Sequence, residues 1–186
     1  MALNDLLANS KKDIVGCWFD KTIRSYRPET ARFLKREKDS FSNPVGSHTA
    51  AGLEEVFDAL CADGEKGSAL RREGLERIIK IRSVQDFTPA QAVAFVFQLK
   101  SAVRETLAGA LRSERILSEL AGLDARIDGL ALEAFDVYMR CRERLHEIKT
   151  GEIKRQSQVL FERAGGPCAM AEKGNGSCGQ AGENCS

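Results

Sequence analysis

Three cysteines near the C-terminus, Cys168, Cys178 and Cys185, have the most distinctive chemistry in this sequence. Thiolates bind soft metal ions and take part in redox reactions. Nine residues separate the first pair and six separate the second, and neither interval matches the compact cysteine pairs of zinc or iron–sulphur sites. We favour redox-active thiols in a flexible tail. The alternative is a tail-bound metal, held by the three thiolates and one further ligand such as Cys141, His146 or a group of a partner.

A second set of candidates is charged and lies among apolar residues: Arg82, Asp86 and Asp136. A charge buried there needs a partner that offsets its desolvation. The favoured interpretation is a buried ion pair between Arg82 and Asp136 that joins two helices. The alternative is a ligand pocket formed by Arg82, Gln85, Asp86, Asp136 and Tyr138. We expect no enzyme, because the chain shows no glycine-rich phosphate loop, no nucleophile with an evident base and no regular metal spacing.

Charge and hydropathy limit the partners of the chain. Lys and Arg number 28 against 27 Asp and Glu, so the net charge is +1 and nucleic acid is not an expected partner. We find no secretory signal and no apolar run approaching the ~20 residues that cross a membrane. We therefore expect a cytoplasmic protein with reduced thiols that is not an integral membrane protein.

The elements that position these residues are predicted to be helices throughout. Apolar residues recur at helical spacing, and no segment alternates with a period of two. The clearest start is Thr88-Pro89, where Thr88 suits a cap, Pro89 a first helical position and Gln91 the far half of a capping box. The apolar run that follows predicts a central helix that ends near Arg112.

Other boundaries follow from turn residues and glycines. We expect a first helix over 3–26 with a break near Asn9-Ser10, and a later helix capped by Ser47 or Thr49. A helix over 68–84 precedes the central one. A kink or break at Gly122 should precede a long last helix. After Ala164 the composition changes to Gly, Ala, Asn and Cys. The sequence therefore predicts a helical domain over 1–164 and a disordered Gly/Cys-rich tail over 165–186.

Several runs of residues resemble a known family. They are PETARFLKREKD (28–39), FSNPVG (41–46), IKIRSVQDFTP (79–89) and FDVYMRCRE (135–143). These runs, in this order, resemble the N-terminal domain of the RsbT co-antagonist RsbRD family, and the resemblance covers about 6–163.

The resemblance implies a sensory or regulatory domain related to the globin-like N-terminal domains of stressosome RsbR proteins. Those domains are helical, commonly dimeric and bind no haem. We therefore expect an all-α, globin-like bundle that acts as a non-catalytic protein-interaction module and forms a homodimer or binds a protein partner. In RsbR proteins the last helix leads to a phosphorylatable STAS domain. No such domain follows in these residues, so we do not expect phosphorelay output.

The resemblance also carries an alternative function. Stand-alone members look similar to proteins encoded beside the dissimilatory sulphite reductase membrane complex. The tail cysteines would then serve a redox or metal-binding accessory protein whose partner is a membrane redox complex.

Although the resemblance implies a globin-like fold, we do not expect haem as a cofactor, because an axial histidine must face the pocket. The two histidines are His48, near a helix start, and His146, late in the last helix among charged residues. None lies between them, where a proximal ligand is expected. We expect no cofactor in the helical domain.

Overall fold

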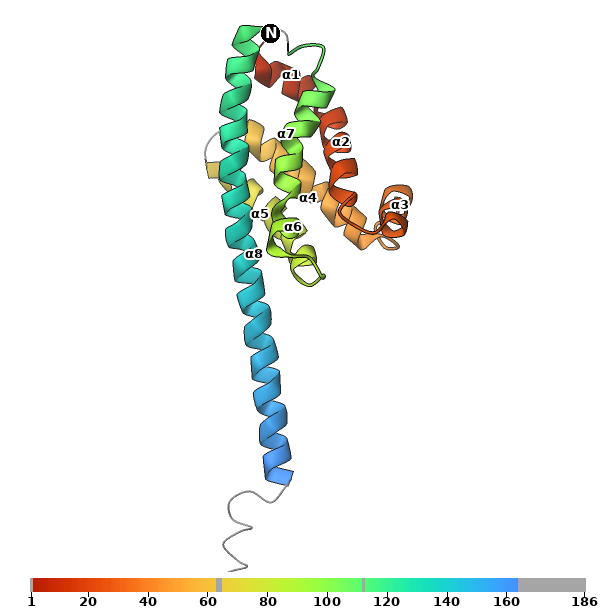
Figure 1. The fold of residues 1–186 in the computed structure, drawn as a ribbon, viewed down its shortest axis with the longest axis vertical. Helices are drawn as coiled ribbons and strands as arrows, with labels where there is room; N and C mark the ends of the chain where they lie inside the picture. Colours follow the sequence, from red (N-terminus) through yellow and green to blue (C-terminus); the bar gives the residue numbers. More distant parts are fainter. Residues whose placement is uncertain (1, 63–64, 112, 164–186) are drawn as a thin grey trace, which may run out of the picture. The chain divides into compact units, whose positions relative to one another are not determined.

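The computed structural model describes residues 2–62, 65–111 and 113–163, and Figure 1 shows their arrangement. Within these ranges the chain forms α-helices and no strand, which confirms the all-α prediction. The tail over 165–186, with Cys168, Cys178 and Cys185, lies outside the described residues. The helices are α1 (Leu3–Asn9), α2 (Lys11–Ile23), α3 (Pro28–Arg36), α4 (Pro44–Cys61), α5 (Glu65–Ser83), α6 (Pro89–Val93), α7 (Phe95–Thr106) and α8 (Glu114–Arg163).

The chain divides into two units, residues 1–142 and residues 143–186. The first holds α1 to α7, the start of α8 and the hydrophobic core. In the described part of the second unit, over 143–163, all side chains except those of Leu145 and Thr150 are exposed. No helix in the described ranges is long and apolar enough to cross a membrane.

The start signals at prolines explain several boundaries. Thr88 and Gln91 form the expected capping box at the start of α6, with Pro89 in the first turn. The expected cap of α4 at Ser47 or Thr49 is wrong. Asn43 caps α4 through its Oδ1, which accepts from the Gly46 N–H at 2.9 Å, because Pro44 begins the helix earlier. The break between α1 and α2 at Ser10 is confirmed.

Two predictions about the later helices are wrong. The central helix does not run unbroken from Pro89 to Arg112, since it divides at Ala94 into α6 and α7 and ends at Thr106. The kink expected at Gly122 is absent, and α8 is helical from Glu114 to Arg163. A single glycine weakens a helix by only about 1 kcal/mol, which burial of the neighbouring Leu120 and Leu123 offsets.

The core of the first unit surrounds α7, whose residues Phe95, Val96, Leu99, Ala102 and Val103 are all buried. Trp18 of α2 is fully buried, and its indole N–H donates to the Phe95 carbonyl at 2.6 Å. The Trp18 and Phe95 rings stack with their centroids 6.2 Å apart. Burial of such large aromatic residues contributes much of the hydrophobic stabilisation of a domain this size.

Helices α4 and α5 approach each other closely at two glycines. A Cβ added at Gly52 would lie 2.7 Å from Ile78 Cγ1 and 2.8 Å from the Gly74 carbonyl oxygen. One added at Gly74 would lie 2.8 Å from the Gly52 carbonyl oxygen. The two helices pack backbone to backbone here, and a side chain at either position would separate them.

Arginine side chains join the C-terminal ends of helices to neighbouring elements. Arg126 of α8 donates to the Leu60 carbonyl at the end of α4, at 3.0 Å. Arg142 donates to the Ser83 carbonyl at the end of α5, at 3.2 Å. Carbonyl groups of a last helical turn lack helical partners and carry partial negative charge, so cations stabilise them.

Candidate functional site

A cavity of about 670 Å³ opens in the first unit where the α2–α3 turn, α3, the start of α4 and the α5–α6 turn meet. Its wall combines six apolar or aromatic residues with six polar ones. The lining residues are Ser25, Tyr26, Arg27, Thr30, Phe33, Leu34, Asn43, Pro44, Val45, Gln85, Asp86 and Phe87. A concave site of this size and composition is typical of small-molecule binding.

The first turns of α3 and α4 form one side of this cavity. Arg27 and Thr30 lie at the start of α3, and Pro44 and Val45 at the start of α4. Asn43 holds these helices together, because its Nδ2 donates to the Leu34 carbonyl at 3.0 Å and to the Glu37 carbonyl at 2.9 Å. The side-chain amide of Asn43 therefore forms its hydrogen bonds within the protein, and its N–H groups are not free to bind a ligand.

Tyr26 and Phe87 make the aromatic wall. Their rings meet edge to face with centroids 5.1 Å apart. The Tyr26 hydroxyl donates to Gln85 Oε1 at 3.0 Å. Burial raises the pKa of Tyr26, an effect that the positive charge of Arg82 and the hydrogen bond to Gln85 partly offset. The phenol is therefore neutral at physiological pH and serves as a hydrogen-bonding wall.

Arg82 packs against this aromatic wall from α5 and is only 1% exposed. Its guanidinium carbon lies 5.6 Å from the Tyr26 ring centroid, 5.0 Å from that of Phe87 and 5.3 Å from that of Phe95. Such distances are those of cation–π contacts.

The hydrogen bonds of Arg82 go to neutral oxygens. The guanidinium donates to the Gln91 carbonyl at 3.1 Å, the Thr22 carbonyl at 3.2 Å and the Ser25 hydroxyl at 3.0 Å, while its Nε has no partner. Burial lowers the pKa of Arg82, and a guanidinium still remains protonated in a protein. A cation without a carboxylate partner among the described residues is therefore enclosed beside the cavity.

The structure brings together only part of the predicted ligand pocket. Gln85 and Asp86 line the cavity, and Arg82 lies directly behind its aromatic wall. Tyr138 is buried in the hydrophobic core. Asp136 is exposed on α8 and lines a separate hollow together with residues of α5.

The predicted ion pair between Arg82 and Asp136 is wrong. Arg82 donates to carbonyl groups and packs on aromatic faces, whereas Asp136 is exposed and needs no buried partner. Apolar neighbours in the sequence do not determine burial on a helix, because Asp136 points away from the side on which Val137 and Tyr138 are buried.

Sequence reasoning missed the half of the cavity that α3 and α4 supply. Tyr26, Arg27, Phe33 and Val45 were not candidates, although Arg27-Pro28 and Asn43-Pro44 are both helix starts. The two prolines predict that a helix begins at each of these positions. Their convergence depends on tertiary contacts that no local pattern contains.

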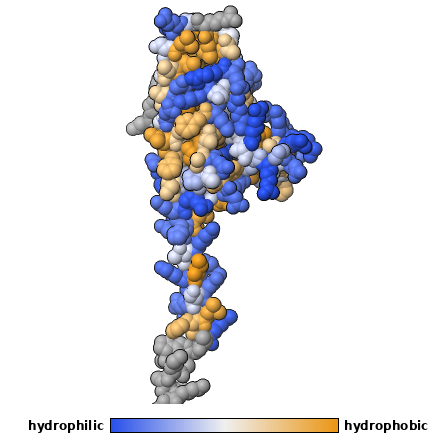
Figure 2. Space-filling view, in the orientation of Figure 1, coloured by the Kyte–Doolittle hydropathy of each residue, from blue (hydrophilic) through white to orange (hydrophobic). Residues whose placement is uncertain are grey.

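A second surface feature lies on the outer side of α7 and the first unit's part of α8. Four large apolar side chains are exposed there: Phe97 by 49%, Leu132 by 72%, Phe135 by 45% and Met139 by 39%. We call these four residues the apolar face. In Figure 2 apolar residues gather over the middle of these two helices.

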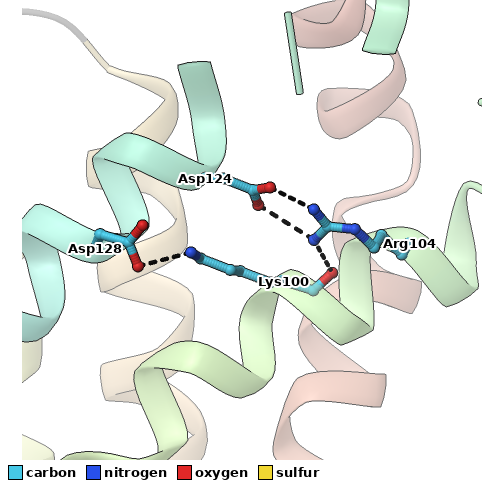
Figure 3. Close-up of polar contacts among 4 residues, drawn as sticks. All are labelled: Lys100, Arg104, Asp124 and Asp128. Atoms are coloured by element: carbon cyan, nitrogen blue, oxygen red, sulfur yellow. Dashed lines mark hydrogen bonds and ion pairs between the residues drawn. The ribbon is translucent and has the colours of Figure 1, made fainter. Parts of the chain in front are cut away.

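Ion pairs between α7 and α8 adjoin the apolar face. Lys100 Nζ lies 2.6 Å from Asp128 Oδ1, and Arg104 makes a two-pronged contact with Asp124 (Figure 3). Lys100 Nζ also lies 5.9 Å from the Phe97 ring centroid. These pairs fix α7 against α8, so the apolar face has a defined shape.

The cysteines and histidines of the described residues form no metal centre. Cys17 and Cys141 are half-buried free thiols, and burial raises the pKa of each. Cys61 is exposed at the end of α4. His48 and His146 are both exposed. The described ranges contain no group of three or more His, Cys, Asp or Glu side chains placed to hold a metal ion.

Comparison with known proteins gives one result. Neither the curated proteins nor the solved structures include a match to this chain. A family model does match, over residues 12–151, a span that contains the whole lining of the cavity and all of the apolar face. That model describes the RsbT co-antagonist protein rsbRD N-terminal domain, and the chain therefore belongs to this family.

Proposed function

We propose that this protein is a non-catalytic regulatory module of the stressosome type that works by protein–protein association, in the cytoplasm and as a homodimer. Membership of the RsbRD N-terminal domain family supports a signalling role. The apolar face of Phe97, Leu132, Phe135 and Met139 is the observation that carries the proposal of a dimer. We expect no haem or other cofactor to take part.

The chemistry of the apolar face suits a second copy of the chain. Isolated exposed apolar residues are ordinary, whereas Leu132, Phe135 and Met139 are spaced to share one face of α8, and such a group is typical of an interface. In a twofold dimer the same face meets itself, so Phe and Leu side chains pack against their own kind. The adjoining pairs Lys100–Asp128 and Arg104–Asp124 are charge-balanced and would form a polar rim.

The described part of the second unit offers a further apolar stripe. Ile153 and Leu160 are both exposed on α8, and residues seven apart share a helical face. We propose that this stripe adds a helix–helix contact to the dimer, as in a short coiled coil.

The first prediction tests association. Phe135→Glu places a charge in the centre of the apolar face, and its desolvation should weaken dimerisation by at least about tenfold. Sedimentation velocity over a range of protein concentrations measures the change. Phe41→Glu is the matched control, since Phe41 is 93% exposed in the α3–α4 loop and should leave the dimer intact. A wild-type chain that stays monomeric at high concentration would sink the proposal.

The three tail cysteines support a second candidate function, that of a redox or metal-binding accessory protein of a membrane redox complex. The observation that favours it is the presence of Cys168, Cys178 and Cys185 within one short Gly-rich segment. Bound metal and free thiols on anaerobically purified protein should then differ between the full chain and a chain ending at Gly166. Six titratable thiols and no metal in the full chain would reject the metal form of this candidate.

A further inference from the structure

We propose that the cavity lined by Tyr26, Arg27 and Phe87 binds a small organic anion, with an acid group at the start of α3 and an aromatic or aliphatic body against the aromatic wall. If the protein is a regulatory module as proposed above, this anion is a signal that the module detects. Binding of the anion is measured separately from dimerisation, so either proposal can fail without the other.

The walls of the cavity fit the body of such a ligand. Tyr26, Phe87 and the 42%-exposed Phe33 supply aromatic surface, and Pro44 and Val45 supply aliphatic surface. A volume of about 670 Å³ exceeds that of a simple inorganic ion and matches cavities that hold molecules of roughly drug size. The apolar part of a ligand would thus contribute most of the affinity.

The start of α3 supplies the place for the acid group. Arg27 precedes the helix and provides no side-chain cap, and Pro28 has no N–H. The amides of Glu29 and Thr30 lie in the first turn, where no helical acceptor exists for them. Arg27 and Thr30 both line the cavity, and the Arg27 side chain has no partner among the described residues. An uncapped helix start beside a free guanidinium is a site for a carboxylate, sulphonate or phosphate.

The enclosed positive charge of Arg82 also favours an anionic ligand. Its guanidinium packs on the Tyr26 and Phe87 rings, and its Nε is buried without a partner. Because the buried cation contacts only neutral oxygens and rings, its field is not cancelled by a carboxylate in contact with it. In a low-dielectric surrounding this field acts on an anion in the cavity more strongly than a surface charge would.

The carboxylate of Asp86 would repel an anionic ligand, so its removal tests the sign of the charge on the ligand. It lines the cavity, is exposed and has no partner among the described residues. Its carboxylate would repel an acid group, and it disfavours ligands that carry several negative charges. Removal of Asp86 should strengthen anion binding, and removal of Arg27 should weaken it. A cationic ligand would show the reverse pattern, and a neutral ligand would respond to neither change.

The experiment compares two fluorescent probes that share an aromatic ring system. One is 1-anilinonaphthalene-8-sulphonate, which carries one negative charge, and the other is N-phenyl-1-naphthylamine, which carries none. Each is titrated into the full chain at low salt. We expect the sulphonate to bind more tightly, with affinity reduced about two- to fivefold by Arg27→Gln and raised by a similar factor by Asp86→Asn. The neutral probe should respond to neither substitution.

Two controls keep the result specific. Arg36→Gln removes the same charge at the other end of α3, where Arg36 is exposed, and should leave sulphonate binding unchanged. Val45→Trp fills the cavity and should abolish binding, with circular dichroism checking that the helices are intact. The proposal is overturned if both probes bind equally, if Arg27→Gln has no more effect than Arg36→Gln, or if binding persists in Val45→Trp because the probe occupies the apolar face. Absence of sulphonate binding to the wild-type chain would overturn it as well.

Discussion

Arg82 shows how this chain stabilises a buried cation without an acid. The Thr22 carbonyl belongs to the last turn of α2 and the Gln91 carbonyl to the end of α6. Both are groups that carry the partial negative charge of a helix C-terminus. Three aromatic rings complete the surroundings. One side chain from α5 therefore fixes the ends of two other helices beside the cavity.

The importance of Arg82 can be measured by an isosteric change. Arg82→Met keeps most of the volume and removes the hydrogen bonds of the guanidinium to the Thr22 and Gln91 carbonyls, so we expect the unfolding free energy to fall by about 2–5 kcal/mol. Arg82→Lys keeps the charge and should cost less. Denaturant unfolding measures both, with Arg32→Met at an exposed position as the control. Equal stability of Arg82→Met and the control would refute this role.

At this scale the sequence allowed part of the site to be predicted. Arg82, Gln85 and Asp86 lie in one short run, and the apolar neighbours of Arg82 and Asp86 marked these two as charges in need of a partner. The partners of Arg82 could not be predicted, because Thr22 and Ser25 lie 60 and 57 residues away and act through a backbone oxygen and a hydroxyl. Hydrogen bonds to a carbonyl depend on the fold and leave no trace in residue type.

Helices are the elements whose starts were easiest to predict. The capping box of α6 depends on Thr88, Pro89 and Gln91, which are adjacent in the chain, and it was predicted correctly. The end of α7 at Thr106 and the continuity of α8 through Gly122 were not. Helix ends depend on which residues become buried, and that is a property of the packed molecule.

The crossing of α4 and α5 yields a prediction with an internal control. Gly52→Ala or Gly74→Ala places a Cβ within 2.8 Å of atoms on the opposite helix, so we expect each to lower stability by about 1–3 kcal/mol. Gly129→Ala on α8 meets nothing within 4 Å and should raise stability by up to about 1 kcal/mol. Thermal unfolding by circular dichroism compares the three variants. Stabilisation by all three would show that α4 and α5 do not pack this closely.

At the scale of the whole molecule, α8 also holds the N-terminus of the chain. Glu119 Oε2 accepts from the Leu3 N–H at 2.7 Å and thereby caps α1, and Arg115 pairs with the same carboxylate at 3.0 Å. The Leu3 N–H first, and then Arg115, hold the pKa of Glu119 below its ordinary value. The first and last helices of the described chain are thus joined through one carboxylate.

This contact predicts a dependence of stability on pH. Because the pKa of Glu119 is lowered by folding, its contribution is fully present above the ordinary value of 4.5 and is lost as the pH falls through the lowered pKa. Glu119→Gln should therefore be less stable than the wild type near neutral pH, and the difference should shrink at about pH 3. Urea unfolding at the two pH values measures it. A difference that does not change with pH would contradict the role of the charged form.

The buried indole of Trp18 gives this protein an intrinsic fluorescent probe. It is the chain's sole tryptophan, so intrinsic emission excited at its absorption edge arises from one known position. Its partner Phe95 also contacts the Arg82 guanidinium, which packs on the two rings that line the cavity. Quenching or a wavelength shift on adding a small acid would report events at the cavity without any attached dye. The same signal would report loss of the α2–α7 contact on unfolding, because Trp18 leaves its fully enclosed position only when these helices separate.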